Sequence, residues 1–188
     1  MILRTLTLSF ALALAAVTTP AGAETDGVSV EVIEQNDGTR TLVHEGVIDA
    51  PVPAVWAALA TPEGWKLWGP KEAWLDFRLG GSIETSYNAG AKPGDAQNIR
   101  HRILAYVPEQ MIALQVAKVP EGAFKEGLLD GMWSVYELEP VGDSQTRLRV
   151  IGIGYKSDPD SSQLLEFFKG GNTYSMQMLE QNIKAAGQ

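Results

Sequence analysis

Alternating apolar and polar positions predict strands over most of the chain between residues 28 and 155. Successive side chains of a strand point to opposite faces, so a half-buried strand repeats with a period of two. The segments with this pattern, joined by turns rich in Gly, Asn, Asp or Pro, are 28–33, 41–49, 72–79, 83–87, 98–107, 111–116, 132–140 and 146–155. We expect most of these segments to pair in one curved antiparallel sheet of about six or seven strands.

The apolar period becomes helical in three places. Residues 52–59 predict a short helix, and a second follows, with Thr61 as its N-cap and Pro62 as its first residue. Residues 161–184 predict a long amphipathic C-terminal helix that Asp158 caps. The residues that share its apolar face on a helical wheel are Leu164, Phe168, Gly171, Ser175, Met178, Leu179 and Asn182.

The centre of this helix face carries the small residues Gly171 and Ser175. Glycine is a poor helix former, so its presence here needs a cause. Either another backbone approaches the helix at this point, or a space is left open beside it. The wheel does not decide between the two, and both remain open.

Several segments carry a resemblance to a known superfamily. They are the run EGVIDAPVPAVW at 45–56, then Trp68, DFRLGG at 76–81, Pro108, and Phe167-Phe168 followed by GGN at 170–172. Together they resemble the START/Bet v 1-like (SRPBCC) superfamily, in the branch named after the activator of Hsp90 ATPase. The resemblance implies an α+β helix-grip fold: a curved antiparallel sheet around a long C-terminal helix, with two short helices after the first long strand. It implies no single function, because the superfamily includes lipid binders, hormone receptors, polyketide cyclases and co-chaperones.

The first residues have the pattern of a secretory signal peptide. Arg4 precedes a short apolar run at 6–17, and Ala21-Gly22-Ala23 fits a small-residue cleavage site. The run is shorter than the roughly 20 residues that a spanning helix needs. We therefore expect residues 1–23 to be a signal peptide and residues 24–188 to form one START/Bet v 1-like domain, periplasmic or secreted.

The net negative charge of the chain argues against negatively charged partners. Removing Arg4 from the 15 basic residues leaves 14 against 23 acidic ones, a net charge of −9 without any basic run. We therefore expect neither nucleic acid nor an anionic membrane surface as a partner, and no stable membrane insertion after cleavage. The sequence leaves the oligomeric state open.

Few residues of this chain could act as metal ligands or as catalytic groups. With no Cys and only His44 and His101, far apart in sequence, we expect neither a metal site nor a cofactor. His101 shares the apolar phase of its strand, so an inward imidazole is a weak candidate for a general acid or base, against the alternative of a core histidine. Asp76 and Glu84 are weaker candidates, because both lie on the polar phase of their strands.

Small residues on facing walls predict a cavity between the sheet and the C-terminal helix. Gly152 and Gly154 are expected to leave inward gaps in the sheet opposite the helix. The expected ligand-binding residues are Phe77, His101, Ile103, Leu114, Gly152, Gly154, Phe168, Gly171, Asn172 and Ser175. The long connection 118–130 is either a lid over this cavity or ordinary surface packing.

The pattern favours an exported helix-grip protein that binds a small hydrophobic or amphipathic molecule, without any need for catalysis. One alternative is a cyclase-like or dehydratase-like enzyme with His101 as its acid or base. The other, which comes from the resemblance, is a chaperone-associated protein-binding module.

Overall fold

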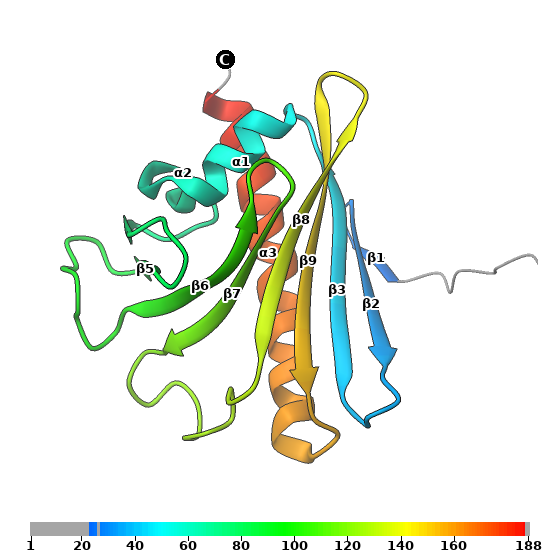
Figure 1. Cartoon of the computed structure of the whole chain (residues 1–188), viewed down its shortest axis with the longest axis vertical. Helices are drawn as coiled ribbons and strands as arrows, with labels where there is room; N and C mark the ends of the chain where they lie inside the picture. Colours follow the sequence, from blue (N-terminus) through cyan, green and yellow to red (C-terminus); the bar gives the residue numbers. More distant parts are fainter. Residues whose placement is uncertain (1–22, 26, 187–188) are drawn as a thin grey trace, which may run out of the picture.

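The computed structural model describes residues 23–25 and 27–186, which form one antiparallel sheet with a long helix against it (Figure 1). Nine strands are formed by these residues, more than the six or seven expected. Their bounds are β1 Ala23–Thr25, β2 Val28–Glu34, β3 Arg40–Ile48, β4 Glu72–Leu75, β5 Ser82–Ser86, β6 Ile99–Val107, β7 Met111–Lys118, β8 Trp133–Val141 and β9 Gln145–Tyr155.

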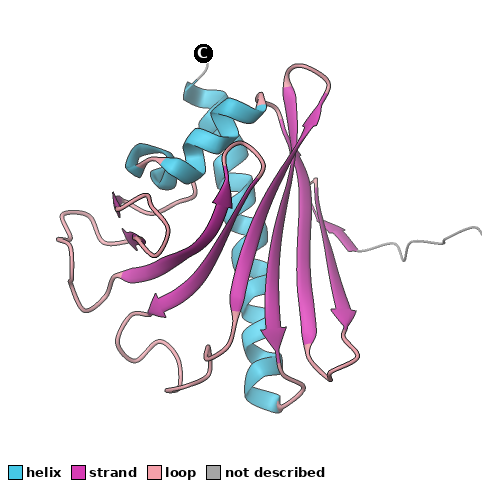
Figure 2. Ribbon diagram, viewed as in Figure 1, coloured by secondary structure: helices cyan, strands magenta, loops and turns pink. Residues whose placement is uncertain are grey.

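The order of the strands confirms the helix-grip fold. They lie in the order β1-β2-β3-β9-β8-β7-β6-β5-β4, so the last strand pairs with the first long one. The helices α1, Val52–Ala60, and α2, Pro62–Lys66, carry the chain from β3 to the far edge of the sheet. The chain then returns strand by strand, and α3, Pro159–Ala186, runs along one face (Figure 2).

The two short helices are fixed by local signals and by two tryptophans. The Thr61 hydroxyl accepts a hydrogen bond from the Gly64 amide at 3.0 Å, which confirms the predicted N-cap. The Trp65 indole donates to the Leu59 carbonyl at 2.8 Å, and the Trp68 indole donates to the Ala58 carbonyl at 3.0 Å. These bonds hold both rings under α1 and satisfy their buried N–H groups.

The long helix begins as the sequence predicts. Asp158 accepts a hydrogen bond from the Ser161 amide at 3.0 Å, and Pro159 is the first helical residue. The predicted buried face needs one correction, because Met176 is 1 % exposed whereas Met178 is only half-buried. The helix is therefore rotated toward β3, and the fully buried residues on this side include Leu165.

A buried histidine ties this helix to β3. His44 is fully buried, and its Nε2–H donates to the Lys169 carbonyl of α3 at 3.0 Å. Burial lowers the pKa of His44, and the hydrogen bond opposes that effect. The imidazole is therefore a neutral packing group between strand and helix.

One predicted strand is shorter than its pattern. Alternation runs from Glu72 to Leu79, but β4 ends at Leu75, and Leu79 is 64 % exposed. After Leu75 the chain folds back on itself, because the Asp76 amide donates to the Ser82 carbonyl at 2.8 Å. Phe77 consequently leaves the sheet plane and packs against the side of α1.

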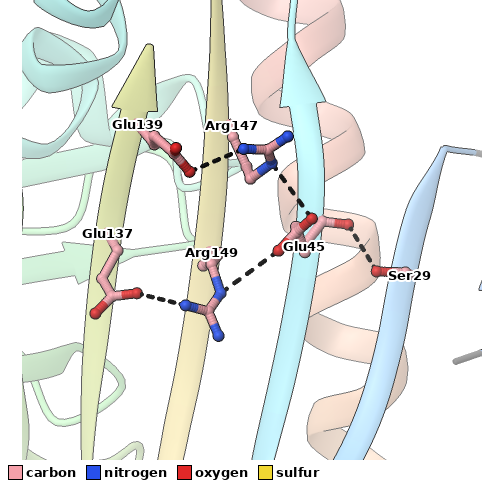
Figure 3. A network of polar contacts seen from close by, with 6 residues as sticks. All are labelled: Ser29, Glu45, Glu137, Glu139, Arg147 and Arg149. Carbon is pink, nitrogen blue, oxygen red and sulfur yellow. Dashed lines mark hydrogen bonds and ion pairs between the residues drawn. The ribbon is translucent and has the colours of Figure 1, made fainter. Parts of the chain in front are cut away.

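The face of the sheet away from α3 carries a network of ion pairs (Figure 3). Arg147 pairs with Glu139 at 2.8 Å, Arg149 pairs with Glu137 at 3.0 Å, and both arginines lie within 3.5 Å of Glu45. The strand register places these side chains in rows across β3, β9 and β8. Pairs as exposed as these add little stability each, so the network chiefly keeps this face polar.

The predicted signal peptide falls almost wholly outside the described residues. Residues 1–22 are not described, and Ala23 and Glu24, on either side of the expected cleavage site, lie in the edge strand β1. The cleavage site and the boundary at residue 24 stay predictions.

Candidate functional site

A cavity of about 350 Å³ lies between the sheet and α3. Its walls are mostly apolar, and seven aromatic side chains dominate them: Trp65, Trp68, Tyr87, Phe124, Tyr136, Phe167 and Phe168. Polar side chains on the wall are few: Thr85, His101, Asn172 and Ser175, with the Tyr87 and Tyr136 phenols. A concave apolar space with a few polar groups is the usual form of a small-molecule site.

The small residues of α3 border this space. A Cβ atom added to Gly171 would meet no atom within 4 Å other than those of its own helix and chain neighbours. Gly171, Asn172 and Ser175 all line the cavity. Of the two causes that the sequence left open, an open space is therefore the one that applies at Gly171.

His101 lies on the cavity wall, against an indole ring. Its imidazole stacks on Trp65, with ring centroids 6.2 Å apart and 21° between the planes. Burial lowers its pKa to about 4, so the ring is neutral at ordinary pH. The residue lines the cavity, and its buried Nδ1 atom has no hydrogen-bond partner among the described residues. The imidazole therefore keeps unused hydrogen-bonding capacity.

The strand that carries His101 is irregular on both sides of it. The register of β6 against β7 shifts between Arg100 and His101, and again between Ile103 and Ala105. The first shift does not turn the imidazole to solvent, because His101 and Ile103 still share the concave side.

A side pocket of about 60 Å³ adjoins the cavity. It shares Tyr136, Phe168 and Asn172 with the main cavity and adds Ser134, Gly152 and Tyr155. A Cβ atom on Gly152 would lie 2.9 Å from the Tyr155 hydroxyl oxygen, so glycine makes room for the phenol. The gap predicted at Gly152 thus exists, and the Tyr155 ring fills part of it.

Four predicted residues do not line either hollow. Phe77 packs edge-to-face on Trp56, with ring centroids 6.0 Å apart. Ile103 and Leu114 are fully buried in the core beneath α1 and α2. Gly154 has φ +96° and faces the carbonyl of Gly131. The glycine is therefore needed for the backbone conformation of β9 and does not open an inward gap.

The two weaker acidic candidates have structural roles. Glu84 is buried, and its carboxylate accepts hydrogen bonds from the Gly94 amide at 2.6 Å and the Asn98 amide group at 2.7 Å. It therefore anchors the loop 87–98. Asp76 is exposed and pairs with Arg78 at 2.9 Å.

Part of the wall comes from the connection 118–130, whose residues the sequence did not assign to the ligand site. The loop between β7 and β8 contributes Val119, Pro120, Ala123, Phe124 and Leu129. Phe124 packs on Phe167, with ring centroids 5.5 Å apart. Lys125 pairs with Asp160 in the first turn of α3 at 2.7 Å, which ties the loop to the helix. Loop residues have no periodicity from which the direction of a side chain could be predicted. Tyr136 could have been predicted to face inward, because it lies on the same face of β8 as Leu138.

Within 23–25 and 27–186 no three His, Cys, Asp or Glu side chains gather as a metal would require. In the same part of the chain, no helix has the length and apolarity to cross a membrane.

The fold and the cavity define a helix-grip domain of the START/Bet v 1-like (SRPBCC) class. The family model described as "Activator of Hsp90 ATPase homolog 1-like protein" matches residues 49–184. The chain belongs to this family. No curated protein matches the chain.

Solved structures of similar fold come from several bacteria. CalU16 from Micromonospora echinospora is 22 % identical, with 83 % of this chain and 82 % of that chain covered and a TM-score of 0.57. Protein MLL2253 from Mesorhizobium loti is 22 % identical, with coverages of 78 % and 98 % and a TM-score of 0.60. The Aha1 dimer from Colwellia psychrerythraea is 18 % identical, with coverages of 74 % and 96 % and a TM-score of 0.53. At these identities the likeness extends to the fold alone.

Proposed function

We propose that this protein binds a small, largely apolar molecule in the cavity between the sheet and α3. The observation that carries the proposal is the open space of about 350 Å³ beside Gly171. Burying apolar surface gives about 25 cal/mol per Å², so an aromatic-walled space of this size favours an apolar guest. A helix that only had to pack would place a larger side chain at this point.

The electrostatics of the wall favour an uncharged guest. No Asp, Glu, Lys or Arg lines the cavity within the described part of the chain. A charge moved from water into such a site loses its hydration and gains no counter-ion.

Native mass spectrometry of protein purified from its own source tests the proposal. A bound small molecule that leaves on denaturation is the expected result. As a control, Ser175→Leu, which places a side chain in the same space, should co-purify with less of it. Wild-type protein that carries no guest and binds no apolar fluorescent probe would contradict the proposal.

His101 gives a specific reason to keep an enzymatic function as a second candidate. Its imidazole is neutral, faces the cavity and has unused hydrogen-bonding capacity. If it acts as a general acid or base, His101→Gln should lower turnover of the true substrate by about 10²–10⁴-fold. If the protein only binds, the same substitution should change the affinity modestly and leave no rate to lose.

We also propose that the protein is exported. The support is the pattern of the first 23 residues: a short apolar run after Arg4 and small residues before Glu24. Export would separate this protein from a cytosolic ATP-dependent chaperone, so we rank the chaperone-associated role suggested by the family's name below ligand binding.

A further inference from the structure

The side pocket adds two polar side chains, Ser134 and Tyr155, to the two that it shares with the main cavity, Tyr136 and Asn172. Ser134, Tyr136, Tyr155 and Asn172 together bring three hydroxyl groups and one amide to a hollow of about 60 Å³. A water-sized group needs only about 10–15 Å³ of such space. The pocket is therefore large enough for one small polar group of a guest.

Three elements place these side chains together. Ser134 and Tyr136 are two residues apart on β8 and point to the same face. Ser134 pairs with Gly152 on β9, where the absence of a side chain lets the Tyr155 phenol lie over the sheet. Asn172 reaches the pocket from α3. Polar groups from two strands and one helix thus converge beside an apolar cavity.

The pocket has hydrogen-bonding capacity and disfavours negative charge. Burial, and after it the neighbouring Tyr87 phenol, raises the pKa of Tyr136 to about 12, against the opposing effect of a hydrogen bond to Ser134. Burial also raises the pKa of Tyr155, and the Tyr136 phenol adds to this. Both phenols are therefore neutral donors, and no cation among the described residues lines the pocket to hold an anion.

We propose that this pocket is the polar subsite of the cavity and takes an uncharged oxygen of the guest, a ketone or a hydroxyl, while the apolar body lies against the aromatic walls. The inference rests on the proposed function, because it needs a guest in the main cavity. It assigns the subsite to Ser134, Tyr136, Tyr155 and Asn172.

Both hollows share Val116, Val150 and Phe168, so one molecule can occupy them together. His101 lies opposite Val116 of β7 and Ser134 lies opposite Leu114, two residues along the same strand, so the backbones of His101 and Ser134 are about 12 Å apart. A guest held at the side pocket therefore leaves the imidazole available for a second polar group farther along. The arrangement favours a flat molecule with polar groups toward its ends.

Three naphthalenes substituted at the same ring position test the subsite: acetylnaphthalene, ethylnaphthalene and naphthoate. They share the apolar body and differ in a ketone, an alkyl group and a carboxylate. Dissociation constants are measured by calorimetry for wild type, Tyr155→Phe, Ser134→Ala and the double variant. Tyr106→Phe is the matched control, since Tyr106 packs on Phe77 and lines neither hollow.

Each subsite variant should bind acetylnaphthalene about fivefold more weakly, as expected for one net hydrogen bond, and ethylnaphthalene unchanged. The double variant should lose more than either single one, and Tyr106→Phe should lose nothing. Naphthoate should bind wild type at least tenfold more weakly than the ketone. If Tyr155→Phe does not fold, Ser134→Ala carries the comparison.

Two outcomes overturn the subsite and leave the proposed function intact. In one, the variants weaken the ketone and the alkyl compound equally, or no more than Tyr106→Phe does. In the other, naphthoate binds as tightly as the ketone, which would make the pocket an anion site. If none of the three compounds binds wild-type protein, the proposed function fails and the subsite fails with it.

Discussion

A Cβ atom built on Gly46 would lie 3.3 Å from the Cε atom of Met176 and 3.3 Å from the Gly27 carbonyl oxygen. At Gly46 the long helix therefore rests directly on β3. At Gly171, one and a half turns earlier in α3, the same construction meets nothing within 4 Å. The helix is close to the sheet on one side and leaves the cavity on the other.

The two glycines should respond oppositely to alanine. Gly46→Ala should lower the free energy of unfolding by about 1 kcal/mol or more, because the strand glycine has a backbone oxygen in the way. Gly171→Ala should raise it by about 0.5–1 kcal/mol, because alanine is the better helix former and has room. Urea unfolding of the two variants beside wild type measures both changes. Destabilisation by Gly171→Ala would mean that the space beside α3 is filled.

The buried histidines predict a specific pH dependence. The pKa of His101 is about 4 in the folded protein and near 6.5 when unperturbed, and the pKa of His44 is lowered as well. Between these values the unfolded chain binds protons that the folded chain does not, so stability should fall as the pH falls through this window. One such proton gives at most about 1.4 kcal/mol per pH unit.

His101→Gln should make this slope shallower between pH 6.5 and pH 4, and His44→Gln should also make it shallower, because the pKa of His44 is lowered too. The measurement is the unfolding free energy at several pH values, and the difference in slope removes the contribution of the carboxylates. An unchanged slope in His101→Gln would show that the ring titrates normally, as it would in a water-filled, well-solvated cavity.

Sequence alone predicted β2, β3 and β5 to β9, the short helices and the caps, because each follows from local chemistry. The alternation over 41–49 places Leu42 and Ile48 on one side, and both are buried in the structure. Thr61 and Asp158 cap where expected. Asn36-Asp37-Gly38 turns the first hairpin, with the Thr39 amide donating to Asp37 at 2.9 Å. Local signals of this kind need no knowledge of the packing.

The cavity could be predicted only in part, because the inward phase of a strand identifies a face and not a place along it. Ile103 and Leu114 share that face with His101, but α1 and α2 cover them. Gly154 was expected to leave a gap in the sheet, but its positive φ explains why a glycine is needed there without any gap. Phe124 lies in an irregular loop, where no period indicates the direction of a side chain.

The mature N-terminus is expected at Glu24. The small residues before it fit a cleavage site, and the apolar run is too short to remain as an anchor. Intact mass of the protein recovered from the periplasmic fraction of an expressing bacterium measures this directly. An Ala23→Leu variant, which spoils the small-residue pattern, should accumulate uncut. Wild-type protein that keeps Met1–Ala23 in the membrane fraction would contradict export in soluble form.

Ser175→Leu tests the cavity through the size of one side chain. Ser175 lies on the cavity wall and is half-buried. If the leucine enters open space, stability should hold or rise, and the affinity for an apolar fluorescent probe should fall. In a filled core the same change would cost about 1–3 kcal/mol. Thr173→Leu on the same helix, outside the cavity lining, is the control. A destabilised Ser175→Leu protein whose folded fraction binds the probe normally would rule out a pocket here.

Phe124 stands between the cavity and a second hollow on the outside of the loop, and it lines both. Its ring packs on Phe167 and Phe168, so truncation should open a direct path from the cavity to solvent. Phe124→Ala is expected to raise the dissociation rate of an apolar probe more than the association rate, because lost wall contacts shorten the residence time.

Lys125→Ala is the control for the loop. It removes the ion pair to Asp160 and leaves the Phe124 ring in place, and such exposed pairs contribute about 1 kcal/mol at most. Stopped-flow fluorescence on both variants separates the two possibilities for the loop. Faster release in Phe124→Ala alone means that the ring closes the cavity. Equal release rates in both variants and wild type mean that the connection is ordinary surface packing and that the guest leaves by another route.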